Sequence, residues 1–180
     1  MKKWTDRIET PIKAELICYD VNGIQIVFGV TEENELKLFH FSSAPFDAEN
    51  LCRKPDGMFP EEGMREAQIK ESFQLVQVNF SGYNRPYEKH GNKYIVTAPG
   101  FMLKFEAISE ERNENGDVLR VVQKDDVTGA KVESVMQFYD GIPVARMYNT
   151  VTNEGKEDQT LEYISSFSYW GIEKEHKAGI

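Results

Sequence analysis

Short runs in which apolar and polar residues alternate, separated by turn residues, cover much of the chain. In Phe101–Ala107 every second residue is apolar, and Pro143–Val151 and Gln159–Trp170 alternate in the same way. Alternation of this kind is typical of β-strands with one buried face. The predicted strands are Lys13–Asp20, Gly23–Val30, Glu35–Phe41, Phe73–Phe80, Tyr94–Thr97, Phe101–Ala107, Val118–Gln123, Lys131–Tyr139, Pro143–Val151 and Gln159–Trp170.

Turn residues separate these predicted strands at short, regular intervals. Asn-Gly pairs occur at Asn22-Gly23 and Asn115-Gly116, and they favour tight hairpin turns. The polar segment Asn153–Lys156 predicts a turn that joins the last two strands into a hairpin. No segment has a convincing amphipathic helical pattern. The sequence therefore predicts an all-β fold, an antiparallel β-sandwich with little helix.

Two segments lack a strand pattern and are expected to be loops. The run Ser109–Asp117 is dense in charged residues. The segment Ser42–Gln68 contains three prolines and two glycines and has no sustained period. Long loops in compact domains often carry function, although a connection without a role is an equal alternative here.

Length and charge limit the possible partners. The 180 residues, 40% of them hydrophobic, suit one domain, predicted as residues 1–172 followed by a polar tail, 173–180. With 30 acidic and 21 basic residues the net charge is −9, which argues against nucleic acid or an anionic membrane as partner. Neither an apolar signal-peptide core nor a membrane-spanning run is visible in the sequence, so a soluble, cytoplasmic protein is expected.

The residues that could bind a metal or act as catalyst form no recognisable constellation. Cys18 and Cys52 lack zinc-site spacing and are predicted to be buried free thiols. The segments Asp20–Gly23 and Asn113–Asp117 lack the spacing of a calcium loop, so no metal or other cofactor is expected. The adjacent carboxylates are read as solvated turns, because neighbours in a turn do not face each other across a substrate; they are Glu61-Glu62, Glu110-Glu111 and Asp125-Asp126.

Histidine and aromatic residues give the candidate binding site. His40 alternates with strand leucines and reads as half-buried, and His176 lies in the polar tail. His90 lies in Phe80–Tyr94, where aromatics interleave with amide and charged residues. Aromatic rings can cover the C–H face of a sugar while polar groups bond its hydroxyls, although tyrosine and asparagine are also ordinary loop residues.

The segment Gly141–Phe167 resembles a known family. It contains G-x-x-V-x-R from Gly141, T-N-x-G from Thr152 and L-E-Y-x-S-S-F from Leu161. These motifs resemble the end of the N-terminal β-domain of bacterial α-galactosidases of glycoside hydrolase family 36. The resemblance is looser elsewhere: Ser42-Ser43 stands where the family has glycine, and no acidic residue precedes Arg85 in its expected place.

The resemblance implies a β-supersandwich, like that of galactose mutarotase, which precedes a catalytic (β/α)8 barrel. The nucleophile and the acid/base aspartates would lie on that barrel, so no residue of this chain is expected to be catalytic. The implied partners are the barrel, galactosides and further subunits of an oligomer. Rim contacts to substrate are assigned to His40, Tyr83, Asn84, Arg85, Tyr87 and His90.

Two other functions remain open at this point. One is a self-contained carbohydrate-binding β-sandwich that uses the Phe80–Tyr94 loop. The other is an aldose-epimerase-like enzyme in which His40 or His90 acts as acid and a glutamate as base.

Overall fold

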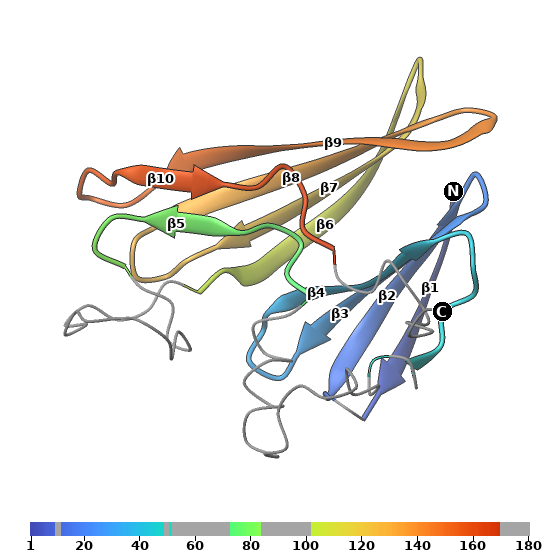
Figure 1. Cartoon of the computed structure of the whole chain (residues 1–180), viewed down its shortest axis with the longest axis horizontal. Helices are drawn as coiled ribbons and strands as arrows, with labels where there is room; N and C mark the ends of the chain where they lie inside the picture. Colours follow the sequence, from blue (N-terminus) through green and yellow to red (C-terminus); the bar gives the residue numbers. More distant parts are fainter. Residues whose placement is uncertain (10–11, 49–50, 52–72, 84–101, 170–180) are drawn as a thin grey trace, which may run out of the picture.

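The computed structural model describes residues 1–9, 12–48, 51, 73–83 and 102–169. Within these ranges the chain forms two four-stranded sheets and a two-stranded ribbon, and all of the strand pairs are antiparallel (Figure 1). The predicted all-β antiparallel sandwich is therefore confirmed.

The first sheet has the strand order β1-β2-β3-β4. Asn22 and Gly23 form the turn between β2 and β3 with φ angles of 52° and 80°. Positive φ at both positions matches the twist of a two-residue hairpin, as the Asn-Gly pair predicted. The bounds of β2, β3 and β4 lie one residue beyond the predicted ones; the strands are β1 Lys2–Ile8, β2 Ala14–Val21, β3 Ile24–Thr31 and β4 Leu36–Ser42.

Strand β1 was not among the predicted strands. It pairs with β2 along its whole length, from Lys2 opposite Asp20 to Ile8 opposite Ala14. Only Trp4 and Ile8 are half-buried, and its other residues are exposed. An edge strand that buries so little shows no alternation in its sequence, which explains why the pattern missed it.

The second sheet has the strand order β6-β7-β8-β9. The prediction of a charged loop over Ser109–Asp117 is wrong, because Ser109–Asn113 continue β6 and pair with β7. The charged side chains of this stretch lie exposed on an edge strand, where burial does not exclude them. The strands are β6 Lys104–Asn113, β7 Gly116–Lys124, β8 Ala130–Tyr139 and β9 Ile142–Asn153.

The ribbon consists of β5 (Val78–Phe80) and β10 (Leu161–Ile164), which pair with each other. The predicted hairpin between the last two strands is therefore wrong, since β9 pairs with β8 and β10 with β5. Backbone hydrogen bonds extend the ribbon at both ends, from Ser81 N–H to the Thr160 carbonyl and from Ser168 N–H to the Leu75 carbonyl. The predicted strands 73–80 and 159–170 thus lie side by side, although their regular parts are shorter.

The turn after β9 directs the chain away from the second sheet. Glu154 N–H donates a 3.0 Å hydrogen bond to the Gly129 carbonyl in the β7–β8 turn region. A Cβ on Gly155 would lie 2.1 Å from the Thr128 carbonyl oxygen, so only glycine allows this approach. The turn is therefore fixed against its neighbour, and the chain passes on to the ribbon.

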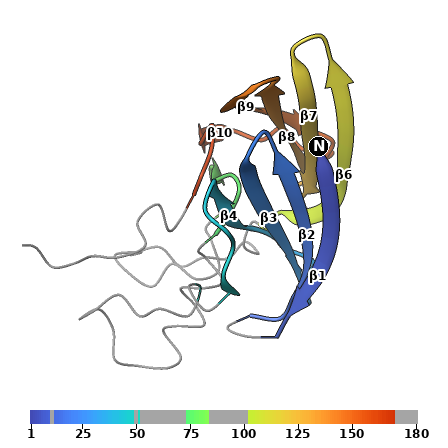
Figure 2. The same cartoon turned by 90° about the vertical axis from the view of Figure 1, so that its right-hand side faces the viewer.

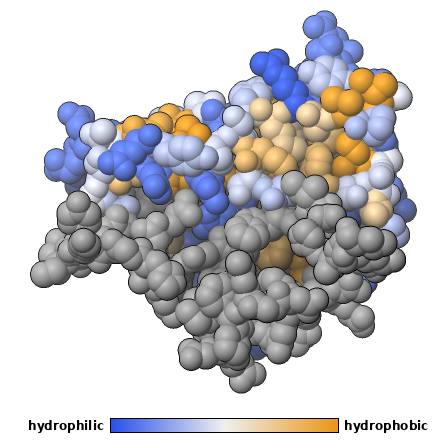
Figure 3. All heavy atoms as spheres, viewed as in Figure 1, coloured by the Kyte–Doolittle hydropathy of each residue, from blue (hydrophilic) through white to orange (hydrophobic). Residues whose placement is uncertain are grey.

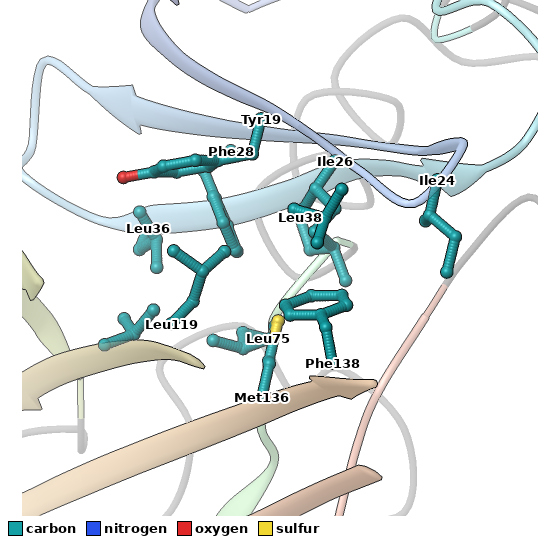
Figure 4. Packing of buried hydrophobic residues seen from close by; sticks show 12 residues of the cluster. Tyr19, Ile24, Ile26, Phe28, Leu36, Leu38, Leu75, Leu119, Met136 and Phe138 are labelled. Atoms are coloured by element: carbon teal, nitrogen blue, oxygen red, sulfur yellow. The ribbon is translucent and has the colours of Figure 1, made fainter. Parts of the chain in front are cut away.

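One hydrophobic core joins the two sheets (Figure 4). The first sheet contributes side chains such as Phe28 and Leu38, and the second contributes Leu119 and Phe138, all with no exposed surface. Burial of a side chain of this size stabilises the fold by about 1.5–3 kcal/mol. Leu75, beside the ribbon, packs in the same core.

The first sheet is also covered on its opposite face. Leu16, Cys18, Val27 and Phe39 are buried there, and loop residues including Phe46 pack against them. The second sheet differs, because the side chains that point away from the core on β9 are exposed. Figure 2 shows the two sheets from the side, with β1 nearest to β6.

Candidate functional site

The structure describes two of the six residues assigned to sugar contacts, His40 and Tyr83. The other four, Asn84, Arg85, Tyr87 and His90, lie outside the described residues, as does His176. The role assigned to these residues therefore stays a prediction.

His40 is half-buried near the end of β4, as its alternation with leucines predicted. Its Nε2 lies 2.7 Å from the Ala44 carbonyl oxygen, and its ring centroid lies 5.7 Å from that of Phe46. Because a carbonyl oxygen can only accept a hydrogen bond, Nε2 is the nitrogen that donates it. These contacts hold His40 to the loop that follows its own strand.

Tyr83 lies just after β5, and its N–H donates a 3.2 Å hydrogen bond to the Phe80 carbonyl. Its side chain packs against the cluster formed by Val76, Val78 and Phe80 with two residues of β8. The described contacts of His40 are to Ala44 and Phe46, whereas Tyr83 packs beside β5, so these contacts do not join the two side chains.

The adjacent carboxylates match the prediction of solvated turns only in part. Asp125 is 2% exposed and accepts hydrogen bonds from Thr128 N–H and Oγ1, both at 2.7 Å, and from Met102 N–H at 3.0 Å. Glu110 and Glu111 lie in β6. The solvated-turn interpretation is corrected for Glu110-Glu111, which lies in a strand where Glu111 pairs with Arg120, and for Asp125, which organises the β7–β8 turn. Asp126 is exposed in that turn, as predicted. Glu61-Glu62 lies outside the described residues.

The outer face of the second sheet carries a shallow hollow of about 190 Å³. Two rows of paired residues build it, because alternate residues of neighbouring strands share a face. One row runs from Glu111 through Val118 and Gln137 to Arg146, and the other contains Arg120, Val135 and Tyr148. We call this depression the outer hollow; it is lined by Glu111, Arg112, Asn113, Asn115, Val118, Arg120, Val135, Gln137, Tyr139, Arg146 and Tyr148.

Polar and charged side chains make up most of the lining of the outer hollow. Val118 and Val135 are 5% and 3% exposed, although both point away from the core between the sheets. Longer side chains of the lining cover these two valines. Tyr148 is 44% exposed, so its ring is open to a ligand.

Most charges around the outer hollow are paired within the protein. Arg120 bonds Glu111 at 3.1 Å and Glu133 at 2.5 Å, and Arg112 bonds Asp117 and Asp140. The hydrogen bond from Arg120 lowers the pKa of Glu111, so this carboxyl stays ionised near neutral pH. Asn113 and Gln137 are hydrogen-bonded to each other.

Arg146 is the exception among these arginines. Its guanidinium carbon lies 5.7 Å from the centre of the Tyr148 ring. Among the residues that the structure describes, no carboxylate lies within ion-pair distance of it. A cation beside an open aromatic ring is therefore available to a ligand in this hollow.

Metal binding has no candidate in the described ranges, because they contain no group of three or more histidine, cysteine or acidic residues that could hold an ion. Cys18 is a buried free thiol, as predicted, and desolvation by burial raises its pKa to about 11. Cys52 lies outside the described residues. In the same ranges no helix has the length and apolar character needed to cross a membrane.

Comparisons with protein-family models, with curated proteins and with solved structures give no match for this chain. The outer hollow was not found from the sequence, since its residues come from four strands. The sequence feature that pointed toward it was the alternation of β9, which places Arg146 and Tyr148 on the same exposed face.

Proposed function

We propose that the chain is a non-catalytic N-terminal β-sandwich domain of an α-galactosidase-like glycoside hydrolase that acts in carbohydrate metabolism. Its role is to pack on the catalytic barrel of the same protein, at the rim where galactosides bind. The motifs between Gly141 and Phe167 support the choice of family, and the antiparallel sandwich is compatible with it. We also propose that the protein acts in the cytoplasm, where a buried free thiol such as Cys18 is typical.

The observation that carries this proposal is the position of the exposed hydrophobic side chains. Large hydrophobic residues with 40% exposure or more number seven in the described ranges, and five of them lie on β9 and β10. Figure 3 shows hydrophobic residues at the surface in the upper part of the molecule, where β9 and β10 lie in Figure 1. We assign four of them, Ile142, Val144, Leu161 and Tyr163, to the packing surface, whereas the fifth, Tyr148, lines the outer hollow.

Scattered exposed hydrophobic residues are normal, but their concentration on two strands is typical of a surface that contacts another protein unit. These strands are also the ones that carry the family motifs. Two of the described acidic residues, Glu111 and Asp125, are engaged in structural contacts. Both observations favour a packing role over a catalytic one.

Reading the gene downstream of the codon for Ile180 tests the proposal. We expect the frame to continue into alternating strands and helices with aspartates at strand ends, and the full-length product to hydrolyse p-nitrophenyl α-galactoside. A stop codon at that place would overturn the proposal. So would a full-length product in which Ile142→Ser with Val144→Ser leaves the contact between domains unchanged in hydrogen exchange.

A carbohydrate-binding sandwich that acts alone is the second candidate, through the Phe80–Tyr94 loop. Calorimetry with galactose and raffinose at millimolar concentration measures it, and heat of binding that Tyr83→Ala abolishes would favour this function. An aldose-epimerase activity is the third candidate, with His40 or His90 as acid. Polarimetry of fresh α-galactose would detect it as mutarotation faster than in buffer.

A further inference from the structure

The outer hollow combines three properties that suit one kind of ligand. Its volume of about 190 Å³ is below the usual range for drug-sized ligands, so it fits a single ring. The exposed ring of Tyr148 offers apolar contact, and Val118 and Val135 lie beneath the polar side chains of the lining. Side-chain amides and tyrosine hydroxyls surround these apolar groups.

Charge then decides between a neutral and an anionic ligand. Arg112 and Arg120 are each paired with two carboxylates, so their charge is neutralised within the protein. Arg146 has no carboxylate partner among the described residues and lies beside Tyr148. An arginine fork matches the two oxygens of a carboxylate, and a ligand carboxylate would supply the missing partner.

The neighbouring acidic groups do not oppose such a ligand strongly. Glu111 is the carboxylate of the hollow lining, and Arg120 holds it with bonds of 3.1 and 3.3 Å. Gln137 stands between Glu111 and Arg146 in the row of paired residues. The net charge of −9 makes this open cation a local feature, so attraction would be confined to the hollow.

We propose that the outer hollow binds a sugar acid, with its carboxylate on Arg146 and its ring against Tyr148. Unlike the packing role, this site needs only the described strands. It involves none of the residues of the Phe80–Tyr94 loop. Its failure would leave the domain proposal standing, because the reading frame tests that proposal separately.

Titration of the isotope-labelled chain with D-galacturonate, followed by amide NMR shifts, tests the site. D-galactose is the matched neutral probe, since it differs only in having a hydroxymethyl group in place of the carboxylate. We expect saturable shifts at millimolar galacturonate, confined to β6–β9 around the hollow, and an affinity for galactose lower by about 10-fold or more.

Two variants distinguish a specific role of the Arg146 charge in binding from the effect of removing any positive charge of the chain. Arg146→Gln should weaken galacturonate binding by about 10-fold or more, while the spectrum keeps the dispersion of the folded chain. Arg7→Gln is the control, because Arg7 is an exposed arginine of the first sheet, paired with Glu9 and Glu15. It should leave the affinity unchanged.

Several results would overturn the proposal. Among them are the absence of saturable shifts with galacturonate, equal affinity for galactose and galacturonate, and equal loss of affinity in the Arg146→Gln and Arg7→Gln variants. Shifts centred on residues outside the second sheet would also reject the hollow as the binding site.

Discussion

The two four-stranded sheets differ in the number of faces that they bury. In the first sheet, β3 has buried residues on consecutive positions from Ile26 to Phe28, because side chains on both of its faces are covered. In the second sheet, β9 alternates strictly between half-buried and exposed positions from Ala145 to Val151. The comparison indicates that the first sheet is covered on both faces, and that β9 of the second sheet is open to solvent on one face.

The largest effect should come from truncating the core that both sheets share. Phe138→Ala removes a side chain with no exposed surface and should lower the free energy of unfolding by about 3–5 kcal/mol. Tyr148→Ala, on the open face of the same sheet, should cost about 1 kcal/mol or less. Urea denaturation followed by tryptophan fluorescence measures both, and similar losses would remove the distinction between the faces.

The second effect concerns the turn that sends the chain from β9 to the ribbon. Gly155→Ala should destabilise the fold by about 3 kcal/mol, because its Cβ would lie 2.1 Å from the Thr128 carbonyl oxygen. Gly141→Ala is the matched control. Gly141 has φ of 78° with no atom within 4 Å of its Cβ position, so only backbone strain of about 1 kcal/mol is expected. Equal thermal shifts for the two variants would contradict the close approach.

The third effect is smaller and tests the buried carboxylate of the β7–β8 turn. Asp125→Ala leaves the N–H groups of Met102 and Thr128 without their acceptor, and should cost about 2 kcal/mol. The adjacent Asp126 is exposed, so Asp126→Ala should change stability by about 0.5 kcal/mol or less. Chemical denaturation of the two variants compares them directly, and a larger loss for Asp126→Ala would refute the assignment.

The smallest effect is a pH dependence at the exposed face of the second sheet. Hydrogen bonds from Arg120 and Lys124 lower the pKa values of Glu111 and Glu154. Their stabilisation is therefore present above the ordinary glutamate pKa of about 4.3, and is lost as the pH falls through the lower folded-state values. The urea concentration at the unfolding midpoint should decrease as the pH is lowered through this range. The decrease should be shallower in the Glu111→Gln variant, which lacks one of the two carboxylates.

Glu114→Gln is the control for this pH experiment. Glu114 is exposed in the β6–β7 turn, and no ion pair of it is found among the described residues. The urea midpoint of Glu114→Gln should depend on pH as that of the unmodified chain does. If its pH dependence were as shallow as that of Glu111→Gln, the pair between Glu111 and Arg120 would contribute nothing.

The sequence predicted the parts of the fold in which burial alternates or turns have a distinctive chemistry. The Asn22-Gly23 turn and the alternation of Pro143–Val151 are found as expected. Strand β1 and the charged half of β6 were missed, because edge strands bury too little to leave a pattern. The predicted pairing of β10 with β9 was also wrong, because alternation shows which face of a strand is buried but not which strand lies beside it.

The candidate site was harder to predict for a related reason. Sequence reasoning looks for polar and aromatic residues that are close along the chain, and so it selected the Phe80–Tyr94 loop. The outer hollow gathers Glu111, Arg120 and Arg146 from three strands through the register of the sheet. Nothing in the local sequence shows that Arg146 lacks a carboxylate partner while Arg120 has two.

Thiol reactivity tests the difference between the two sheets most directly. In a Cys52→Ser background, Cys18 is the remaining thiol and lies 2% exposed on the covered outer face of the first sheet, with its pKa raised to about 11. Thr150→Cys adds a second thiol at an exposed position of β9. With a disulfide reagent at mildly alkaline pH, one thiol per folded chain should react fast and the other only after denaturation. Fast reaction of both thiols in the folded chain would contradict burial of the first sheet on both faces.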